Sequence, residues 1–416
     1  MSDSTFHPFR AVPRTGVIFV SEEAAKRGFR PGDATWSNLG QGQPESGPLD
    51  GAPERPSSLP LLADDFEYAP VGGLRELREA VANLYNTIYR PNARSKYSAE
   101  NVAIAGGGRV ALTRVLSAVG QVNVGHFLPD YTAYEELLDV FRAFHPTPIM
   151  LEPKAQYVFG ANELEREIMG RGLGAVLLSN PCNPTGRVIA GSALADYVRV
   201  SRETGCALIA DEFYGNYIYS QDGATRTVSA AEFVDDVDRD PIVILNGLTK
   251  CWRFPGWRVS WVIGPRPLIE AVNSAGSFLD GGGARPLQRA AIELVSPERF
   301  SRETEVVQKV FGAKRALVLD ALQSMGVQVE APPQGTFYVW ASLASLPGPL
   351  ADGMELFRRA LARNVIVIPG EFFDVNPGKR RNRRRFQNYV RISFGPAKAE
   401  VERGLSVLGD LIREHR

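Results

Sequence analysis

Cysteine and histidine are scarce in this chain of 416 residues, and long apolar runs are missing. Its three cysteines and four histidines show no metal-like spacing, which argues against a metal site. Three cysteines also argue against a disulfide framework and are typical of a protein from a reducing compartment. No apolar run approaches the ~18 residues that a membrane helix needs, and the first residues lack the basic and apolar regions of a signal peptide. We therefore expect a cytoplasmic protein with no membrane partner.

An excess of charge of either sign is also missing, because 47 Lys and Arg stand against 47 Asp and Glu. Such a chain has no overall field that attracts nucleic acid, so any anionic ligand must be bound by a local site. The run Lys379–Arg385 does hold six basic residues in seven, without interleaved aromatic residues. We interpret it as a solvated loop, or alternatively as a loop that attracts anionic substrates, and expect no nucleic-acid partner.

The order of apolar and amphipathic segments predicts an α/β fold. Seven short apolar runs bounded by turn residues are typical of buried strands in a mostly parallel sheet: Val102–Ala105, Val124–Leu128, Pro148–Leu151, Ala175–Ser179, Ala207–Ala210, Ile242–Leu245 and Val259–Ile263. Helix-like segments lie between them, for example Ser192–Thr204. Apolar residues at spacings of three and four also predict helix faces from Leu74 to Ile88 and from Val401 to Ile412.

Changes of composition along the chain suggest its domain organisation. The segment Gln43–Pro60 is rich in Pro, Gly and Ser and resembles a linker, and near Pro297 the pattern changes to a long helical stretch. Short strands are then predicted at Thr336–Trp340 and Tyr389–Phe394. We expect an N-terminal arm over residues 1–45 that contributes to the small domain, a large domain over 46–296 and a small α+β domain over 297–416.

The most specific local feature is a lysine that follows a predicted strand. Lys250 comes after the run Ile242–Leu245, and Arg258 lies eight residues further on, before the next strand. An isolated lysine at such a place is commonly a core residue whose amine reaches solvent. An amine beside a fixed guanidinium, in contrast, suits a cofactor that carries both an aldehyde and a phosphate.

With this lysine, seven segments in order resemble the pyridoxal-phosphate enzymes of fold type I, specifically the class I and II aminotransferases. They span about Asn38 to Arg391 and are Tyr68–Leu74, Gly106–Leu112, Pro129–Tyr134, Asn180–Gly186, Asp211–Tyr214, Thr249–Lys250 with Arg258, and Tyr389–Gly395. The resemblance implies a large domain with a mostly parallel seven-stranded sheet and a smaller α+β domain. It also implies a pyridoxal 5'-phosphate enzyme that moves an amino group between an L-amino acid and a 2-oxo acid through a lysine aldimine.

A glycine-rich turn is the predicted phosphate site. Gly106–Gly108 follow one predicted strand and open a helix, so free amides and the positive helix end can hold a phosphate. A dinucleotide loop is disfavoured, because Ala111 occupies the third glycine position and no acidic residue ends a strand about 20 residues on. The resemblance assigns cofactor binding to five residues here, namely Gly107, Gly108, Arg109, Thr249 and Arg258. It also implies a homodimer with shared active sites, in which Tyr68 reaches the phosphate of the other subunit.

Asp211 ends an apolar run, where a carboxylate is costly unless it meets a cation or several donors. By resemblance its partner is the pyridinium nitrogen of the cofactor, which makes the ring an electron sink. The resemblance further implies that Asn183 and Tyr214 bind the phenolic oxygen of the ring and that Tyr131 stacks on its face. Lys250 would form the aldimine and transfer the α-proton as base and acid.

The substrate residues implied by the resemblance are Gly42, Asn183 and Arg391. The planar guanidinium of Arg391, in a strand-like segment, can bind the α-carboxylate of an amino acid through two hydrogen bonds. Two departures from the family pattern stand out. Gly247 replaces a phosphate-binding hydroxyl residue, so Thr249 or a water would have to compensate, and Arg285 is offset from the position of a side-chain carboxylate clamp, which disfavours aspartate as donor.

Two other functions fit parts of the pattern. A lyase or synthase of the same fold, of the β-elimination or cyclopropane-forming type, would use the same cofactor chemistry and differ in its products. A regulator or scaffold would need a DNA-binding module before Asn38, but Pro8, Pro13 and Pro31 interrupt helices there. The joint presence of a lysine, an aspartate and two arginines at the family positions also argues against a scaffold without activity.

Overall fold

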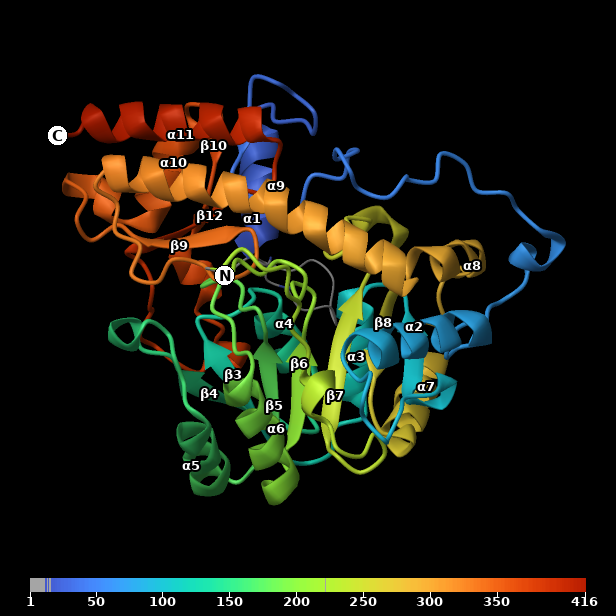
Figure 1. Ribbon diagram of the computed structural model, residues 1–416. Coiled ribbons are helices and arrows are strands. Elements are labelled where there is room, and N and C mark those ends of the chain that lie inside the picture. The colour runs from blue at the N-terminus through green and yellow to red at the C-terminus, as the bar shows by residue number, and fades with distance from the viewer. Residues whose placement is uncertain (1–11, 13, 15, 221) are drawn as a thin grey trace, which may run out of the picture.

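The computed structural model describes residues 12, 14, 16–220 and 222–416 and has a central seven-stranded sheet (Figure 1). Its spatial order is β2-β8-β7-β6-β5-β3-β4. The strands are β2 (Val102–Ala105), β3 (Asn123–Leu128), β4 (His145–Met150), β5 (Leu173–Ser179), β6 (Ala207–Asp211), β7 (Ile242–Gly247) and β8 (Ser260–Ile263). β8 is antiparallel to both of its neighbours, whereas the other pairs are parallel. The predicted α/β class and all seven predicted strands are confirmed.

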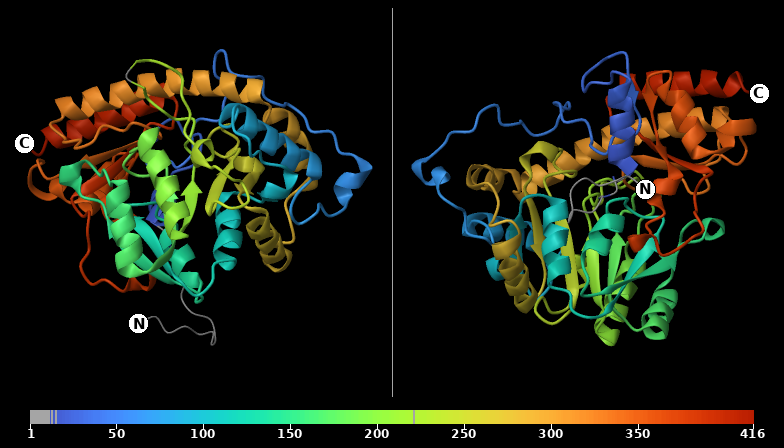
Figure 2. Two further views of the ribbon diagram at one scale, coloured as in Figure 1. Left: turned by 60° about the horizontal axis from the view of Figure 1, so that its bottom comes forward. Right: turned by 180° about the vertical axis from the view of Figure 1, so that it is seen from behind.

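Helices cover both faces of this sheet, which explains why its strands are continuous apolar runs (Figures 1 and 2). α5 and α6 pack together on one face, α3 and α7 pack together on the other, and α2 packs on α8. Their bounds are α2 (Arg75–Ile88), α3 (Gly108–Ser117), α4 (Tyr134–Val140), α5 (Ala161–Arg171), α6 (Ser192–Thr204), α7 (Arg266–Leu279) and α8 (Arg285–Leu294). The predicted helix over Ser192–Thr204 coincides with α6.

The residues after α8 form a second group of elements, above the sheet in Figure 1. The long helix α9 (Pro297–Ser324) runs from α8 to α10 (Gly353–Leu361) and α11 (Lys398–Arg413). A three-stranded antiparallel sheet contains β9 (Tyr338–Ser342), β11 (Ile368–Pro369) and β12 (Tyr389–Ser393). β9 begins later than predicted, because Thr336 has a left-handed backbone with a φ of 65°.

The N-terminal segment packs on these late elements. β1 (Ser37–Asn38) pairs in parallel with β10 (Val365–Ile366), although more than 300 residues separate them along the chain. Before it lies α1 (Gly16–Lys26), a helix that the sequence analysis did not identify. In the sequence, α1 falls between Pro13 and Pro31, so the spacing of the prolines leaves room for a short helix.

The segment Gln43–Pro60 is irregular, as the linker interpretation requires, but it is held in place. Glu45 pairs with the buried Lys314 of α9 at 3.0 Å. Two arginines of α9 donate hydrogen bonds to backbone carbonyls of the segment, Arg299 to Glu54 at 2.6 Å and Arg302 to Gly51 at 2.7 Å. The segment therefore has a fixed path over α9, which matters because residues 38–43 contribute to the site described below.

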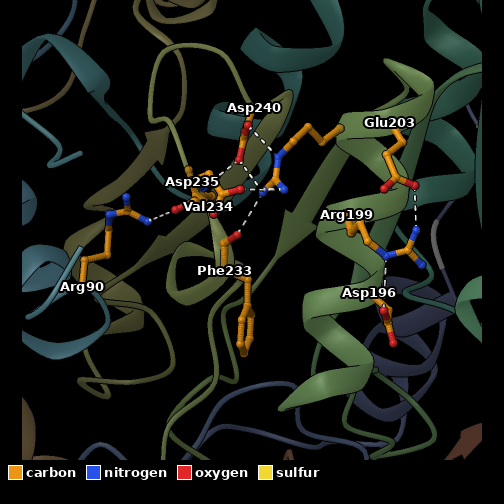
Figure 3. A network of polar contacts seen from close by, with 9 residues as sticks. Arg90, Asp196, Arg199, Glu203, Phe233, Val234, Asp235 and Asp240 are labelled. Carbon is orange, nitrogen blue, oxygen red and sulfur yellow. Dashed lines mark hydrogen bonds and ion pairs between the residues drawn. The ribbon is translucent and has the colours of Figure 1, made fainter. Parts of the chain in front are cut away.

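Arginines also fix the last part of the segment between β6 and β7, residues 233–240 (Figure 3). Arg202 of α6 binds Asp240 at 2.9 Å and Asp235 at 2.7 Å, and Arg90 donates to the carbonyl of Val234 at 2.6 Å. Such contacts satisfy buried backbone oxygens of this segment.

Within the described residues, no helix is both long and apolar enough to cross a membrane.

Candidate active site

A cleft of about 1180 Å³ lies at the carboxyl ends of β5, β6 and β7, where parallel sheets commonly bind ligands. Its walls come from the start of α3, the segment 38–43 and the strands β11 and β12. Most of the predicted site residues line it: Gly42, Gly108, Arg109, Tyr131, Asn183, Asp211, Tyr214, Thr249, Lys250, Arg258 and Arg391. Of the other two, Gly107 lies beside Arg258, and Tyr68 is 94% exposed on the surface.

The glycine turn after β2 is shaped by a neighbouring arginine. Gly107 has a φ of 111°, which side chains other than glycine rarely adopt, and a Cβ there would overlap the guanidinium of Arg258. α3 begins at Gly108, so the amides of its first turn have no partner within the helix. Three features thus meet at this end of the cleft: unpaired amides, a positive helix end and a guanidinium.

Two further polar groups at this end have few partners. Among the described residues, the guanidinium of Arg258 donates a hydrogen bond to the carbonyl of Pro255 at 3.0 Å and pairs with no carboxylate. The hydroxyl of Thr249 is buried and has no hydrogen-bond partner among the described residues. Because buried polar groups are almost always bonded, this arrangement indicates an anion site.

Lys250 occupies the centre of the cleft, and its amine donates a hydrogen bond to the carbonyl of Gly42. Burial lowers the pKa of Lys250 to about 7, and the positive charges of Arg391, Arg109 and Arg258 act in the same direction. The negative charge of Asp211 opposes them. A lysine with this pKa has a large neutral fraction at neutral pH, which is the form that acts as nucleophile or base.

Asp211 is the last residue of β6 and accepts a hydrogen bond from the hydroxyl of Tyr134 at 2.6 Å. The amide of Phe213 also donates to it, at 3.4 Å. Burial raises the pKa of Asp211, while these hydrogen bonds and the charge of Lys250 act against that rise. The structure therefore presents a desolvated carboxylate at the base of the cleft, suited to a cationic partner.

Aromatic residues surround the middle of the cleft. The hydroxyl groups of Tyr214 and Tyr338 are hydrogen-bonded at 2.9 Å. Tyr131 is partly buried, and its ring meets that of Tyr134 edge to face with 5.4 Å between the centroids.

Arg391 of β12 is 1% exposed and also lines the cleft. It donates to the side-chain oxygen of Asn183 at 3.1 Å and to the carbonyl of Gly40 at 2.8 Å. Its guanidinium carbon lies 4.0 Å from the centre of the Tyr338 ring, and its Nε has no partner among the described residues. No carboxylate of these residues neutralises it, which leaves Arg391 free to bind an anionic ligand.

Sequence reasoning missed two residues of this site, Tyr134 and Tyr338. Tyr134 lies in the Pro129–Tyr134 motif, but nothing in that motif shows that its hydroxyl reaches Asp211, 77 positions later. Tyr338 lies in no recognised motif, and only the packing of β9 against β12 brings it beside Arg391. The run Lys379–Arg385 is not part of the cleft lining, and Lys379 and Arg381 pair with Glu135 and Asp374.

The chain matches a family model described as aminotransferase class I and II over residues 34–408. It is 28% identical over 405 residues to a valine–pyruvate aminotransferase of Mycobacterium tuberculosis, which covers 96% of each protein. It is 26% identical over 358 residues to an aspartate aminotransferase of Streptomyces avermitilis, or 83% of this chain and 82% of that protein. Among solved structures, an aminotransferase from Mycobacterium tuberculosis matches with a TM-score of 0.79 at 25% identity, over 97% of this chain and 98% of that one.

Proposed function

The chain belongs to the class I and II aminotransferases, and on this premise we propose that its cleft binds pyridoxal 5'-phosphate and moves an amino group between an L-amino acid and a 2-oxo acid. The observation that carries the proposal is the convergence of Lys250, Asp211 and Arg391 on one cleft. When bound, pyridoxal phosphate withdraws electrons from the α-carbon of the amino acid. The chain must supply a phosphate site, a partner for the ring nitrogen, a base and a carboxylate site.

The residues at the glycine turn fit the phosphate. The amides of Gly108 and Arg109 at the start of α3, the guanidinium of Arg258, which pairs with no carboxylate of the described residues, and the unbonded hydroxyl of Thr249 can all donate to phosphate oxygens. Gly107 allows this close approach, because any side chain there would displace Arg258. The fit rests on groups that the described residues leave unsatisfied.

The middle of the cleft fits the cofactor ring. Asp211, held by Tyr134, would bind the protonated ring nitrogen, because a buried carboxylate needs a cationic or donor partner. Asn183 accepts from Arg391 through its side-chain oxygen, so its amide nitrogen can donate to the phenolic oxygen together with Tyr214. Tyr131 would pack its face on the ring.

Lys250 would hold the cofactor through its amine and then move the α-proton of the substrate. Its pKa of about 7 places the neutral amine and the protonated amine at similar populations near neutral pH. This match to the working pH lets one group first accept a proton and later return it. Burial, and after it the positive charges of the nearby guanidinium groups, lower the pKa and keep the amine from being fully protonated.

Arg391 would bind the α-carboxylate of the donor and of the oxo acid. Its hydrogen bonds to Asn183 and Gly40 and its contact with the ring of Tyr338 fix the plane of the guanidinium before substrate arrives. A guanidinium that is already held in one plane loses little conformational freedom when it binds a carboxylate, which favours tight and oriented binding. The substrate α-carbon would then be held in the same cleft as Lys250.

For the donor side chain, the cleft favours an apolar group. Beyond Arg391 its lining includes Val17, Ile18, Leu137, Ile366 and Ile368. The charged residues at this end are engaged with the backbone: Glu400 accepts from the amide of Asn38, and Arg403 donates to the carbonyl of Trp36. The relatives reported above act, by name, on valine and on aspartate, and the lining supports the apolar type.

We further propose a cytoplasmic homodimer. Large apolar side chains that are exposed in one chain gather on the segment before α2 and on the end of α7: Leu61, Leu62, Phe66, Tyr68, Phe278 and Leu279. The two stretches are neighbours, since Asp64 pairs with Arg285 just after α7. An exposed apolar patch of this kind is typical of a subunit interface. In such a dimer, Tyr68 would lie close to the cleft of the partner subunit.

We also propose that the chain is divided into an N-terminal arm over residues 1–45, a large domain over 46–296 and a small domain over 297–416.

Lys250 provides the direct test. Holoenzyme reduced with borohydride and mapped by peptide analysis should carry the pyridoxyl group on Lys250, and Lys250→Ala should lose both the label and the activity. Lys309→Ala, which removes an exposed lysine of α9, is the matched control and should behave as the unchanged protein. A label on another lysine refutes the assignment.

Product analysis separates transamination from the lyase alternative. An amino donor added without acceptor should yield one oxo acid per site and leave the cofactor in its amine form. Release of ammonia with return of the aldehyde form would instead indicate a lyase. Donors with apolar side chains should give higher kcat/KM values than aspartate, and the opposite order would contradict the proposed donor class.

A further inference from the structure

At the position where the family pattern has a phosphate-binding hydroxyl residue, three residues before Lys250, this chain has Gly247. The structure explains why a side chain is excluded there. A Cβ on Gly247 would lie 2.5 Å from the Oγ of Ser260, 2.6 Å from its Cα and 2.7 Å from the carbonyl oxygen of Val259. Ser260 therefore fills the space that a side chain at 247 would use.

Ser260 lies between the two loops of the phosphate site. It is the first residue of β8, and its register partners are Ala105 on β2 and Gly247 on β7. Ala105 leads directly into Gly106 and Gly107, and Gly247 leads into Thr249 and Lys250. Side chains of paired residues lie on the same face of a sheet. The side chain of Ser260 therefore projects from the face on which a side chain at residue 247 would lie.

The hydroxyl of Ser260 is also unsatisfied. It is fully buried and has no hydrogen-bond partner among the described residues, a property that it shares with Thr249 nearby. A buried hydroxyl without a partner is unfavourable, which indicates a partner that the protein chain does not itself provide. Arg258, two residues earlier, places its guanidinium against Gly107 at the same end of the cleft.

We propose that Ser260 supplies the hydroxyl hydrogen bond to the cofactor phosphate that residue 247 cannot supply, so that the hydroxyl has moved from β7 to its register partner on β8. This inference rests on the proposed binding of pyridoxal 5'-phosphate. It assigns to β8 a direct part in cofactor retention, in addition to its place in the sheet. Ser260 would act together with Thr249, Arg258 and the first amides of α3.

The test compares two forms of the cofactor on the apoenzyme of Ser260→Ala. Dissociation constants are measured by absorbance or fluorescence titration for pyridoxal 5'-phosphate and for pyridoxal, which lacks the phosphate. We expect Ser260→Ala to weaken binding of the phosphate form by about tenfold, as for loss of one hydrogen bond to a charged group, and to leave pyridoxal binding within twofold. Ser201→Ala, which removes a buried hydroxyl of α6 bonded to the carbonyl of Cys206, is the control for general damage.

Apoenzyme stability gives a second readout that does not depend on activity. Because the Ser260 hydroxyl lacks a partner, its removal should leave the thermal midpoint of the apoenzyme unchanged or raise it, whereas Ser201→Ala should lower it. If Ser260→Ala folds poorly, Ser260→Cys, which has a weak donor in place of the hydroxyl, replaces it in the titrations. The proposal is overturned if the loss of affinity for pyridoxal 5'-phosphate is less than three times the loss of affinity for pyridoxal. Failure of the unchanged protein to bind pyridoxal 5'-phosphate would instead refute the proposed function itself.

Discussion

Replacing Asp211 by asparagine would remove the negative charge at the base of the cleft while keeping the size of the side chain. The amide oxygen of asparagine can still accept from Tyr134, which bonds Asp211 at 2.6 Å, so the local packing should persist. The lost interaction is a charge-assisted hydrogen bond to the ring nitrogen, worth ~1.5–3 kcal/mol, or about 10–150-fold in cofactor affinity. The effect on the reaction should be larger, since the charge acts where electrons accumulate in the transition state.

Removal of one such electrostatic group typically lowers kcat by about 10²–10³-fold. We therefore expect Asp211→Asn, assayed at saturating cofactor, to lose at least about a hundredfold in kcat. Saturation is verified by titrating cofactor until the rate is constant, which separates the chemical defect from weaker binding. Asp196→Asn on the exposed face of α6 is the control and should retain full activity. A loss below about tenfold would refute the role of Asp211 as partner of the ring nitrogen.

Three further predictions address the substrate, the pH dependence and the dimer. Arg391→Lys should raise the donor KM and lower kcat/KM by at least about tenfold, because a point charge cannot replace two parallel hydrogen bonds; an unchanged kcat/KM would remove Arg391 from the substrate site. The pKa of Lys250 is lowered to about 7, so cofactor uptake by the apoenzyme, followed by absorbance, should speed up as pH rises through 7, and a flat profile would contradict this. Since an unfolded lysine keeps its proton up to pH ~10.4, the same group should make the apoenzyme more stable to urea as pH rises above 7, and Lys250→Met should remove that slope. Inactive Lys250→Ala chains mixed and refolded with Tyr68→Ala chains should regain activity above that of either variant, because a mixed dimer would contain one complete site; no gain would refute sharing of Tyr68 between subunits.

Local patterns were enough to predict most of the sheet and several helices. Apolar runs such as Val102–Ala105 and Ala175–Ser179 are fully or nearly fully buried strands, because a parallel sheet covered on both faces needs apolar residues at every position. The helix Ser192–Thr204 was predicted to the residue, and it ends before Gly205, whose left-handed backbone terminates it. Elements bounded by strong local signals can thus be read without tertiary information.

The candidate site was predictable as a set of residues, since its motifs are short and several lie at strand ends. Asp211 ends β6 and Lys250 lies three residues after the end of β7, and the carboxyl ends of parallel strands lie at one edge of a sheet. Their convergence on one cleft was therefore a consequence of the predicted topology. The individual roles stay predictions, because they depend on the proposed cofactor, which the sequence does not encode.

Tertiary structure alone decided the contacts and the electrostatics. Arg391 meets Asn183 across 208 positions, and Tyr338 reaches both Arg391 and Tyr214 because β9 pairs with β12. The lowered pKa of Lys250 arises from burial and from guanidinium groups brought in by β12, α3 and the turn before β8. The exclusion of a side chain at Gly247 depends on its register partner Ser260, and register is a property of paired strands that neither strand shows by itself.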